Sequence, residues 1–500
     1  MIAPVAPGSG DALDADASSA HRSGQGGRMA AIELSADTLT PVAAALRLKD
    51  RLAFILESVE GGARYGRYSF VGVRGRTLIV DRGEAVVWDA HYRELERFAE
   101  ADPLEALRRV LPPRVEAPGF PLPLSAGIGF VSYDAAARWE KLPVPDFDPV
   151  GLPEAVFHMP SVVIAFDHLA QTATLAAIAD DGADDRLASV AAQLSIPAPD
   201  EAPTRLGSPG QRPVRHVPPA ADPVYEAAVA KLVEDIHAGE MLQVVPARRF
   251  SVPNRAPALT IYRALRRINP SPYLFALDLG PGSSILGASP ELLVRVRDGE
   301  VVTRPLAGTR PRSDDPVRDA ELEADLRADQ KELAEHAMLV DLARNDVGRV
   351  AQPGSVEWPL LYGVERYSHV MHLVSEVRGR LRADRDAFDA VRATFPAGTL
   401  SGAPKVRAMQ AIAEVEGARR GAYGGAVGYF SPEDTEIAIT IRSVVLRDGT
   451  AFVHAGAGIV ADSIPATESA EVAAKAGAVL TALAQAEATM AAAAGEGIEA

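Results

Sequence analysis

The sequence contains no cysteine. That absence excludes disulfides, zinc–thiolate sites, iron–sulfur clusters and any cysteine nucleophile, and a lack of disulfides is typical of a cytoplasmic protein. The chain also lacks any apolar run of about 18 residues, so we expect no transmembrane span. Its net charge of −16 is unfavourable for nonspecific binding to nucleic acid or to an anionic membrane. An anionic substrate would therefore need a pocket that is locally basic or contains a metal ion.

The composition changes along the chain and suggests a division into regions. Residues 1–28 are rich in Gly, Ala, Ser and Asp, which predicts a disordered tail, and they lack the basic and apolar segments of a signal peptide. The stretch 181–221 is rich in Pro, Ala and Asp and predicts an exposed connection. It divides an N-terminal region, residues 29–180, from a larger region, residues 222–485. We expect residues 486–500 to form a C-terminal tail.

Short strand patterns and helix patterns occur in both regions. Arg82–Gly83 and Asp298–Gly299 lie between alternating apolar runs, which predicts two β-hairpins. Asp102 and Asp222 each precede a proline at the first position of a helical pattern and are predicted helix caps. The mixture predicts an α+β fold of packed antiparallel β-sheets flanked by helices, rather than a regular βαβ repeat.

A glutamate pair marks the stretch that the sequence is organised around, residues 329–350. This stretch predicts a helix with a polar exit at residues 344–346. Glu332 and Glu335 are three residues apart and so project from one face of that helix.

A second pair, Glu468 and Glu471, opens the last predicted helix. If the two helix faces meet, the four carboxylates would repel one another strongly without a cation. Clusters of oxygen ligands alone suit Mg²⁺. The alternative is that both pairs are solvated charge on surface helices.

Two glycine-containing segments could approach a ligand closely. Residues 398–402 form a Gly/Ser loop before a helix, whose backbone N–H groups could bind an anion, although a simple helix cap explains the loop equally well. Gly456 and Gly458 offer an approachable backbone, but glycine in a strand also marks a β-bulge.

Three other side chains have a functional and a structural interpretation. Arg442 follows an apolar strand pattern, where it would either face outward or pair with a carboxylate ligand. His372 could be a satisfied core histidine, and Tyr423 could be a packing ring.

Eleven stretches, in order, resemble the chorismate-binding enzyme family, and within it most closely anthranilate synthase component I. The resemblance covers about residues 30–485. The stretches are LESVEGGARYGRYSFVG, GEMLQVVPARRFS, NPSPYLF, LGASPELLVR, PLAGTRPR, KELAEHAMLVDLARND, YSHVMHLVS, PAGTLSGAPKVRAM, YGGAVGYF, IRS and AGAGIV. The resemblance implies a Mg²⁺-dependent lyase that converts chorismate and ammonia to anthranilate and pyruvate. This would be the first step of tryptophan biosynthesis, inhibited by tryptophan.

The resemblance also implies roles for individual residues. Glu335 and Glu471 would be direct Mg²⁺ ligands, with Glu332 and Glu468 beside them. His372 and Thr399 fall on active-site positions, and His372 would handle a proton in the elimination step. The residues that would hold the substrate are Gly308, Thr309, Tyr423, Arg442, Gly456, Ala457 and Gly458.

Two positions distinguish this chain from other members of the family. Relatives that add water to chorismate carry a lysine where Gln243 stands, so ammonia is favoured here as the nucleophile. Aminodeoxychorismate synthase component I has a nucleophilic lysine where Ala307 stands, and an alanine cannot form a covalent adduct. That synthase is the alternative enzyme, and a non-catalytic tryptophan-sensing paralogue is the alternative of another class.

The family's known partner and effector lead to two further expectations. A chain without cysteine cannot hydrolyse glutamine by the family's route, so we expect a separate glutamine amidotransferase subunit (component II) in a hetero-oligomer such as a heterotetramer. The tryptophan site would use Glu57 and Ser58 for the amino group of tryptophan, whereas Pro272, Tyr273 and Leu274 would flank its ring. Simple strand packing is the alternative.

Overall fold

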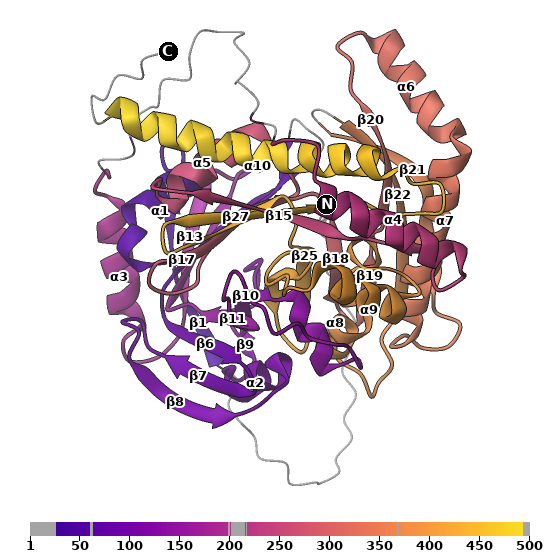
Figure 1. Cartoon of the computed structure of the whole chain (residues 1–500). Helices are drawn as coiled ribbons and strands as arrows, with labels where there is room; N and C mark the ends of the chain where they lie inside the picture. The colour runs from indigo at the N-terminus through magenta and orange to yellow at the C-terminus, as the bar shows by residue number, and fades with distance from the viewer. Residues whose placement is uncertain are drawn as a thin grey trace.

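Two large sheets pack face to face, and helices cover both outer faces (Figure 1). The structure is a computed structural model that describes residues 27–60, 64–198, 201, 216, 218–367 and 370–493. Almost all of the predicted N-terminal tail and much of the predicted connection lie outside these residues. The architecture confirms the α+β class that the sequence predicts.

The first sheet has eleven strands in the order β15-β27-β26-β17-β16-β2-β5-β12-β13-β1-β9. Its strands are β1 (Gly27–Ser35), β2 (Leu52–Glu57), β5 (Tyr68–Val73), β9 (Val115–Glu116), β12 (Val162–Asp167), β13 (Thr172–Ile178), β15 (Ala247–Pro253), β16 (Tyr273–Asp278), β17 (Ser283–Ser289), β26 (Ser443–Arg447) and β27 (Thr450–Gly456). Strand β2, from the first region of the sequence, pairs with β16 from the second.

The second sheet has twelve strands in the order β20-β22-β19-β18-β25-β24-β10-β11-β6-β7-β8, with β21 paired to β22. Its strands are β6 (Arg76–Asp81), β7 (Glu84–Trp88), β8 (Glu94–Ala99), β10 (Gly127–Val131), β11 (Ala155–Met159), β18 (Leu292–Arg297), β19 (Glu300–Thr303), β20 (Leu306–Pro311), β21 (Glu357–Arg366), β22 (Val370–Arg380), β24 (Ala426–Phe430) and β25 (Thr435–Ile439). Both predicted hairpins are present, as β6–β7 and β18–β19. Here β10 pairs with β24, so the two regions of the sequence do not form separate sheets.

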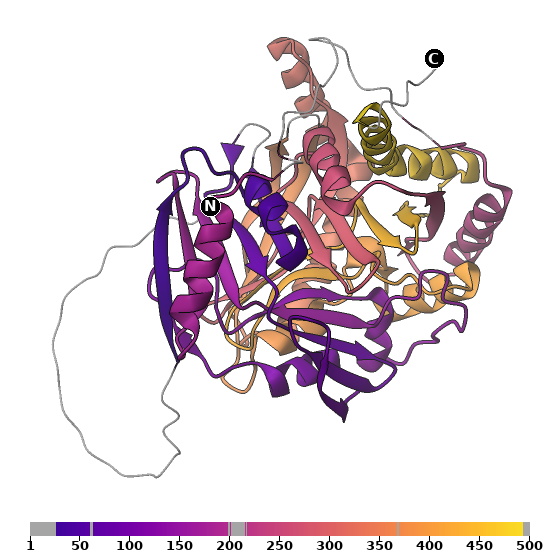
Figure 2. The same ribbon diagram turned by 90° about the vertical axis from the view of Figure 1, so that its left-hand side faces the viewer.

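Helices cover the sheets in two groups. Those against the first sheet are α1 (Pro41–Arg47), α3 (Ala183–Leu194), α4 (Pro223–His237), α5 (Ala258–Ile268) and α10 (Pro465–Ala493). Those against the second are α2 (Pro103–Val110), α7 (Gln330–Gly348) and α8 (Ala387–Thr394). Helix α9 (Lys405–Glu416) contributes to both cores, and α6 (Pro316–Ala328) projects from the body (Figures 1 and 2). No helix in the described ranges is both long and apolar enough to cross a membrane.

Local sequence explains several helix ends. Asp102 and Asp222 cap α2 and α4 as predicted, each accepting hydrogen bonds from two backbone N–H groups. Helix α7, however, continues through the predicted polar exit at residues 344–346. The reason is tertiary: Asp346 is buried and pairs with Lys405 at 2.8 Å, which gives a polar residue a partner inside the core.

Three boundaries also differ from those expected. Strand β1 begins at Gly27, inside the expected N-terminal tail, and α3 lies inside the expected connection. Helix α10 extends to Ala493, past the expected start of the C-terminal tail at residue 486. The reason for this last difference is that the segment is rich in alanine, which favours helix, and that Ala486 is buried against the first core.

Glycines in the second sheet allow close approach between neighbouring strands. A Cβ added at Gly129 of β10 would lie 1.8 Å from the carbonyl oxygen of Val156 in β11. By contrast, nothing lies within 4 Å of a Cβ added at Gly348, at the end of α7.

We therefore expect Gly129→Ala to lower the free energy of unfolding by about 1–3 kcal/mol, because the backbone must shift to relieve the overlap. The matched Gly348→Ala variant should be neutral or slightly stabilising, since alanine is the better helix former. Thermal melting of both variants beside the unmodified protein measures the difference. Equal melting temperatures for the two variants would contradict this account of the strand packing.

Candidate active site

Two neighbouring chain segments cross between the two sheets, in opposite directions. One runs from β17 to β18 and carries Glu291, and the other runs from β25 to β26 and carries Arg442. The crossings are hydrogen-bonded to each other, from Ala288 N to Arg442 O at 3.2 Å and from Ile439 N to Glu291 O at 3.0 Å. Arg442 has a φ of 50°, a left-handed conformation that is uncommon for a bulky residue. The paired crossings therefore fix where these two side chains lie.

The guanidinium of Arg442 is mostly buried. Within the described part of the chain it has no hydrogen-bonded or ion-paired carboxylate, so its pairing with the carboxylate of a ligand stays a prediction. Burial lowers the pKa of Arg442, while the nearby Tyr423 and Glu471 act in the opposite direction. An unpaired cation in such a place is suited to bind an anionic group.

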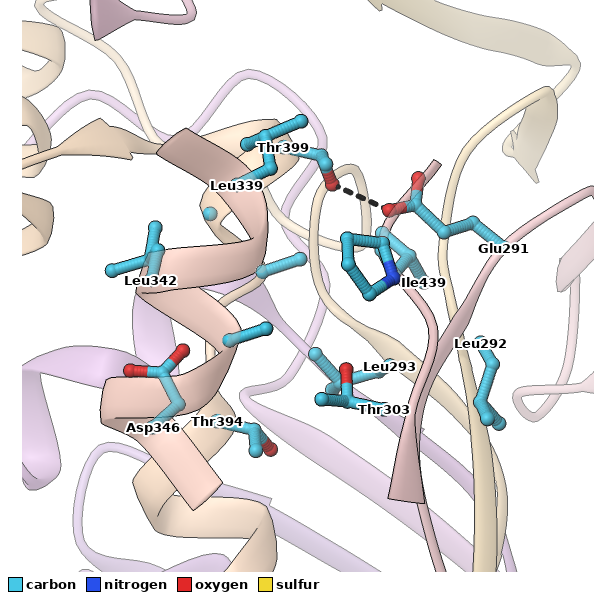
Figure 3. Close-up of a pocket in the computed structure, with 14 residues that line it drawn as sticks. Glu291, Leu292, Leu293, Thr303, Leu339, Leu342, Asp346, Thr394, Thr399 and Ile439 are labelled. Carbon is cyan, nitrogen blue, oxygen red and sulfur yellow. Dashed lines mark hydrogen bonds between the residues drawn. The ribbon is translucent and has the colours of Figure 1, made fainter. Parts of the chain in front are cut away.

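Glu291 is an acidic residue on the crossing that pairs with the one carrying Arg442. It is 7% exposed, and the Thr399 hydroxyl donates a hydrogen bond to its Oε1 at 2.9 Å (Figure 3). Burial raises the pKa of Glu291 to about 8, although the hydrogen bond from Thr399 acts against the shift. At neutral pH this carboxyl group therefore holds a proton that it can donate. The sequence analysis did not single out Glu291; the signal was its place in the stretch LGASPELLVR.

His372 lies on β22, opposite Thr309 of β20. Its Nδ1 is 2.9 Å from the Gly308 carbonyl oxygen and 3.1 Å from the Thr309 hydroxyl. Burial lowers the pKa of His372, and the charge of Arg442 lowers it further, so the ring is neutral at neutral pH. A carbonyl oxygen can only accept a hydrogen bond, so Nδ1 carries the proton and Nε2 keeps a lone pair. The structure thus brings together three of the predicted site residues.

The segment Gly456–Gly458 forms another wall of the site. A Cβ at Gly456 would lie 2.8 Å from the Tyr423 hydroxyl, and one at Gly458 would lie 2.8 Å from Gln243 Nε2. The middle residue of the segment is fully buried. Gln243 Oε1 is also buried and has no hydrogen-bond partner in the described structure. Glycine is therefore needed here for close approach of side chains, rather than for a β-bulge.

Arg420, which the sequence analysis did not single out, fixes several of these segments. Its guanidinium donates to the carbonyl oxygens of Leu400 at 2.8 Å and Val245 at 2.6 Å, and pairs with Glu416 at 2.5 Å. It also lies 5.6 Å from the centre of the Tyr423 ring. One buried cation thus connects the loop after Thr399, the strand after Gln243, and Tyr423.

The two predicted glutamate pairs come together, because the start of α10 lies near α7 (Figure 1). Burial raises the pKa of Glu335, and so do the charges of Glu332, Glu468 and Glu471, although Lys331 opposes them. Burial also raises the pKa of Glu468. The two pairs therefore lie within electrostatic reach of each other, although the Glu471 side chain is 48% exposed.

Basic side chains already contact three of these carboxylates. Lys475 pairs with Glu471 at 2.6 Å and also donates to the Gly456 carbonyl oxygen at 3.1 Å. Arg310 lies 3.3 Å from Glu332 Oε1, and Lys331 lies 3.9 Å from Glu335. Glu332 also packs against Gly308, where a Cβ would lie 3.0 Å from its Oε2.

The donor set fits Mg²⁺ only in part. No three His, Asp or Glu side chains converge on one point within the described residues to form a metal-binding group. Mg²⁺, however, commonly takes one or two carboxylates and completes its shell with water and substrate oxygens. Glu335 and Glu471, one from each helix, could supply those two ligands.

The residues predicted for an effector lie in the first sheet, where Leu274 of β16 pairs with Glu57 of β2. Glu57 is buried and already engaged: Tyr262 donates to it at 2.6 Å, and Arg266 donates twice at 2.8 Å. The amino group of an amino acid would therefore compete with Arg266 for this carboxylate.

The remaining residues of this group lie close to Glu57. Val59 N donates to the Ser271 carbonyl oxygen at 3.0 Å, which brings Ser58 beside Pro272. Tyr273 places its hydroxyl 3.4 Å from Glu436, toward the second sheet. Ser58 packs against Gly66, where a Cβ would lie 2.8 Å from the Ser58 hydroxyl.

Comparison with known proteins agrees with this geometry. The model of the family described as "chorismate binding enzyme" matches residues 54–481. Anthranilate synthase component 1 of Streptomyces coelicolor is 44% identical over 471 residues, covering 90% of this chain and 88% of that protein.

Solved structures give the same result. The crystal structure of anthranilate synthase component I from Streptococcus pneumoniae is 36% identical with a TM-score of 0.73, covering 89% of this chain and 98% of that chain. The menaquinone-specific isochorismate synthase of Escherichia coli is 21% identical with a TM-score of 0.66, covering 92% and 95%, and shares the fold. The resemblance stated from the motifs is thereby confirmed: this chain belongs to the chorismate-binding enzyme family.

Proposed function

We propose that the chain is the large subunit of a cytoplasmic anthranilate synthase. It would convert chorismate and ammonia to anthranilate and pyruvate, with ammonia supplied by a glutamine amidotransferase subunit and with inhibition by tryptophan. The observation that carries the proposal is the unpaired Arg442 at the paired crossings, within electrostatic reach of His372 and Glu471. A doubly charged acid can bind one carboxylate to that cation and the other to a metal on the two glutamate pairs.

Arg442 and the segment Gly456–Gly458 would orient the substrate. The guanidinium can hold the enolpyruvyl carboxylate by two parallel hydrogen bonds. The segment Gly456–Gly458 has no side chains at its two ends, so the substrate can lie directly against the backbone. Tyr423, held by Arg420, would close one side of the site.

Glu291 is suited to donate a proton to the hydroxyl group that leaves C4 of the ring. Its raised pKa keeps it protonated at neutral pH, and Thr399 holds the carboxyl group in place. A neutral carboxyl also avoids adding a negative charge beside a dianionic substrate. His372 would then accept the ring proton at Nε2 when pyruvate is eliminated, since its Nδ1 proton is held by Gly308.

Glu335 and Glu471 would bind Mg²⁺, with Glu332 and Glu468 beside them. When bound, the ion would neutralise the ring carboxylate and act as a Lewis acid. Without the ion, Arg310 beside Glu332 and Lys475 beside Glu471 reduce the repulsion among the glutamates.

Ammonia is favoured as the nucleophile by two side chains that lack basic or nucleophilic character. Gln243 cannot deprotonate water, but its buried Oε1 can accept a hydrogen bond from ammonia. Ala307 lies in β20, beside Gly308, and offers no amine for a covalent adduct. Because Ala307 offers no amine, aminodeoxychorismate synthase is the second candidate function.

The purified chain is expected to form anthranilate from chorismate, Mg²⁺ and ammonium, seen as anthranilate fluorescence with an equal amount of pyruvate. Glutamine should not replace ammonium, because the chain has no cysteine nucleophile. A chelator should abolish the reaction, and added Mg²⁺ should restore it.

Other products would change the assignment. Release of isochorismate or aminodeoxychorismate would replace it with another activity of the family. Full activity from glutamine with this chain alone would disprove the need for a partner subunit.

A pH profile tests the role of Glu291. At saturating substrates, kcat should fall as the pH rises through about 8, because Glu291 loses its proton there. Glu291→Gln should lower kcat by roughly 10²–10⁴-fold and remove that decline. Thr399→Val removes a hydrogen bond that lowers the pKa of Glu291, so the fall of kcat in this variant should move to higher pH. A decline that stays in place in both variants would assign the proton to another group.

Tryptophan would bind beside Ser58 and compete with Arg266 for Glu57. We expect Ser58→Arg to relieve inhibition by tryptophan, because a second cation there fills the space beside Gly66 and repels the amino group. Activity with ammonium should be kept. The control is Ser195→Arg, at the exposed end of α3, which should stay fully inhibited. Inhibition that persists in Ser58→Arg would place the effector elsewhere.

A further inference from the structure

The ring of Tyr423 is held in the site by its neighbours and not by its own hydroxyl. No residue in the described part of the chain forms a hydrogen bond with that hydroxyl, which lies beside Gly456. Burial raises the pKa of Tyr423 to about 12, although the charges of Arg420 and Arg442 act against the shift, so the phenol keeps its proton. A protonated hydroxyl without a protein partner can donate a hydrogen bond to an anionic ligand beside Arg442.

The imidazole of His454 stacks on the Tyr423 ring. The two ring centres are 5.5 Å apart, and the ring planes are inclined by 17°. His454 lies on β27, two residues before Gly456, and is half-buried. Among the residues that the structure describes, neither ring nitrogen of His454 has a hydrogen-bond partner. The imidazole therefore acts on Tyr423 through its flat face, and such an aromatic pair contributes more than the burial of its area alone.

The charges around the two rings keep His454 neutral. Arg249 of β15 lies opposite His454 in the first sheet, and the Arg420 guanidinium is 5.6 Å from the centre of the Tyr423 ring. Burial lowers the pKa of His454 to about 3, and the charges of Arg249 and Arg420 act in the same direction. His454 thus offers Tyr423 an uncharged surface at neutral pH and leaves the binding of anions to Arg442.

We propose that His454 is a positioning residue for the reaction, an inference that rests on the proposed function. Its ring holds Tyr423 so that the hydroxyl, beside Gly456, donates a hydrogen bond to the substrate carboxylate that Arg442 binds. Without the imidazole, the space beside Tyr423 is open and the phenol ring can turn its hydroxyl away from Gly456. Substrate binding is then weaker, whereas the proton transfers assigned to Glu291 and His372 are unchanged.

The test is His454→Ala, with initial rates measured against chorismate at saturating ammonium and Mg²⁺. The half-saturating chorismate concentration should rise roughly three- to tenfold, as expected for the loss of one aromatic pair, while kcat changes less than about twofold. His454→Phe keeps a flat ring, so its value should stay within about twofold of that of the unmodified protein. Melting temperatures establish that each variant is folded.

The matched control is Phe452→Ala, on the same face of β27, where the phenyl ring packs against the core between the sheets. This variant should lower the melting temperature without raising the half-saturating chorismate concentration. An equal rise in Phe452→Ala would overturn the inference, because it would mean that any loosening of β27 weakens substrate binding.

The Tyr423→Phe variant shows whether His454 acts through the Tyr423 hydroxyl. In that background, His454→Ala should raise the half-saturating chorismate concentration by less than about twofold, because the group that His454 positions is already missing. A full additional rise would contradict the proposed role.

Two other results would also overturn it: an unchanged chorismate value in the folded His454→Ala variant, or a His454→Phe variant as impaired as His454→Ala. If His454→Ala does not fold, His454→Gln, which also lacks a ring, decides in its place. Failure of the unmodified chain to consume chorismate would instead overturn the proposed function.

Discussion

The site depends on one constraint: the chain crosses twice, side by side, from one sheet to the other. Burying a guanidinium without a partner is costly in free energy, and a mobile segment would simply turn Arg442 outward. Here the backbone of each crossing is bonded to the other, through Ala288 and Arg442 and through Ile439 and Glu291. Both crossings also continue into paired strands, β17 with β26 and β18 with β25. The pairing of these four strands therefore keeps the Arg442 guanidinium buried, although burial of that charge is unfavourable by itself.

The distribution of charge follows from the same arrangement. The chain as a whole is strongly acidic, so the field around it repels a dianion. At the site, Arg442 provides one fixed positive charge, and in the function we propose a divalent cation beside the four glutamates would provide more. Burial keeps Glu291 protonated and therefore removes what would be a fifth negative charge. A single physical effect, loss of hydration, thus makes the charge of Arg442 costly without an anion beside it and keeps a proton on Glu291.

The sequence predicted what is locally determined and missed what depends on distant pairing. The hairpins at Arg82–Gly83 and Asp298–Gly299 and the caps at Asp102 and Asp222 follow from neighbouring residues, and all are present. The sharing of both sheets between the two regions was not predictable, because nothing local indicates that β2 pairs with β16 or β10 with β24. The pKa of Glu291 could not be predicted either, since it is set by burial. The continuation of α7 past residues 344–346 depends on Lys405, about sixty residues away in sequence.

The loop that contains Thr399 connects these features. One side of it is held by Arg420 through the Leu400 carbonyl oxygen, and Lys405, just after it, is held by Asp346 and Thr394. Its Thr399 hydroxyl contacts Glu291, and both residues line the small apolar cavity beside α7. A shift of this loop would therefore change the contact to Glu291, the shape of the cavity and the position of Tyr423 together. Buried polar contacts of this kind, fully paired, give rigidity that apolar packing alone does not. That rigidity fixes Glu291 and Thr399 relative to the crossing that carries Arg442.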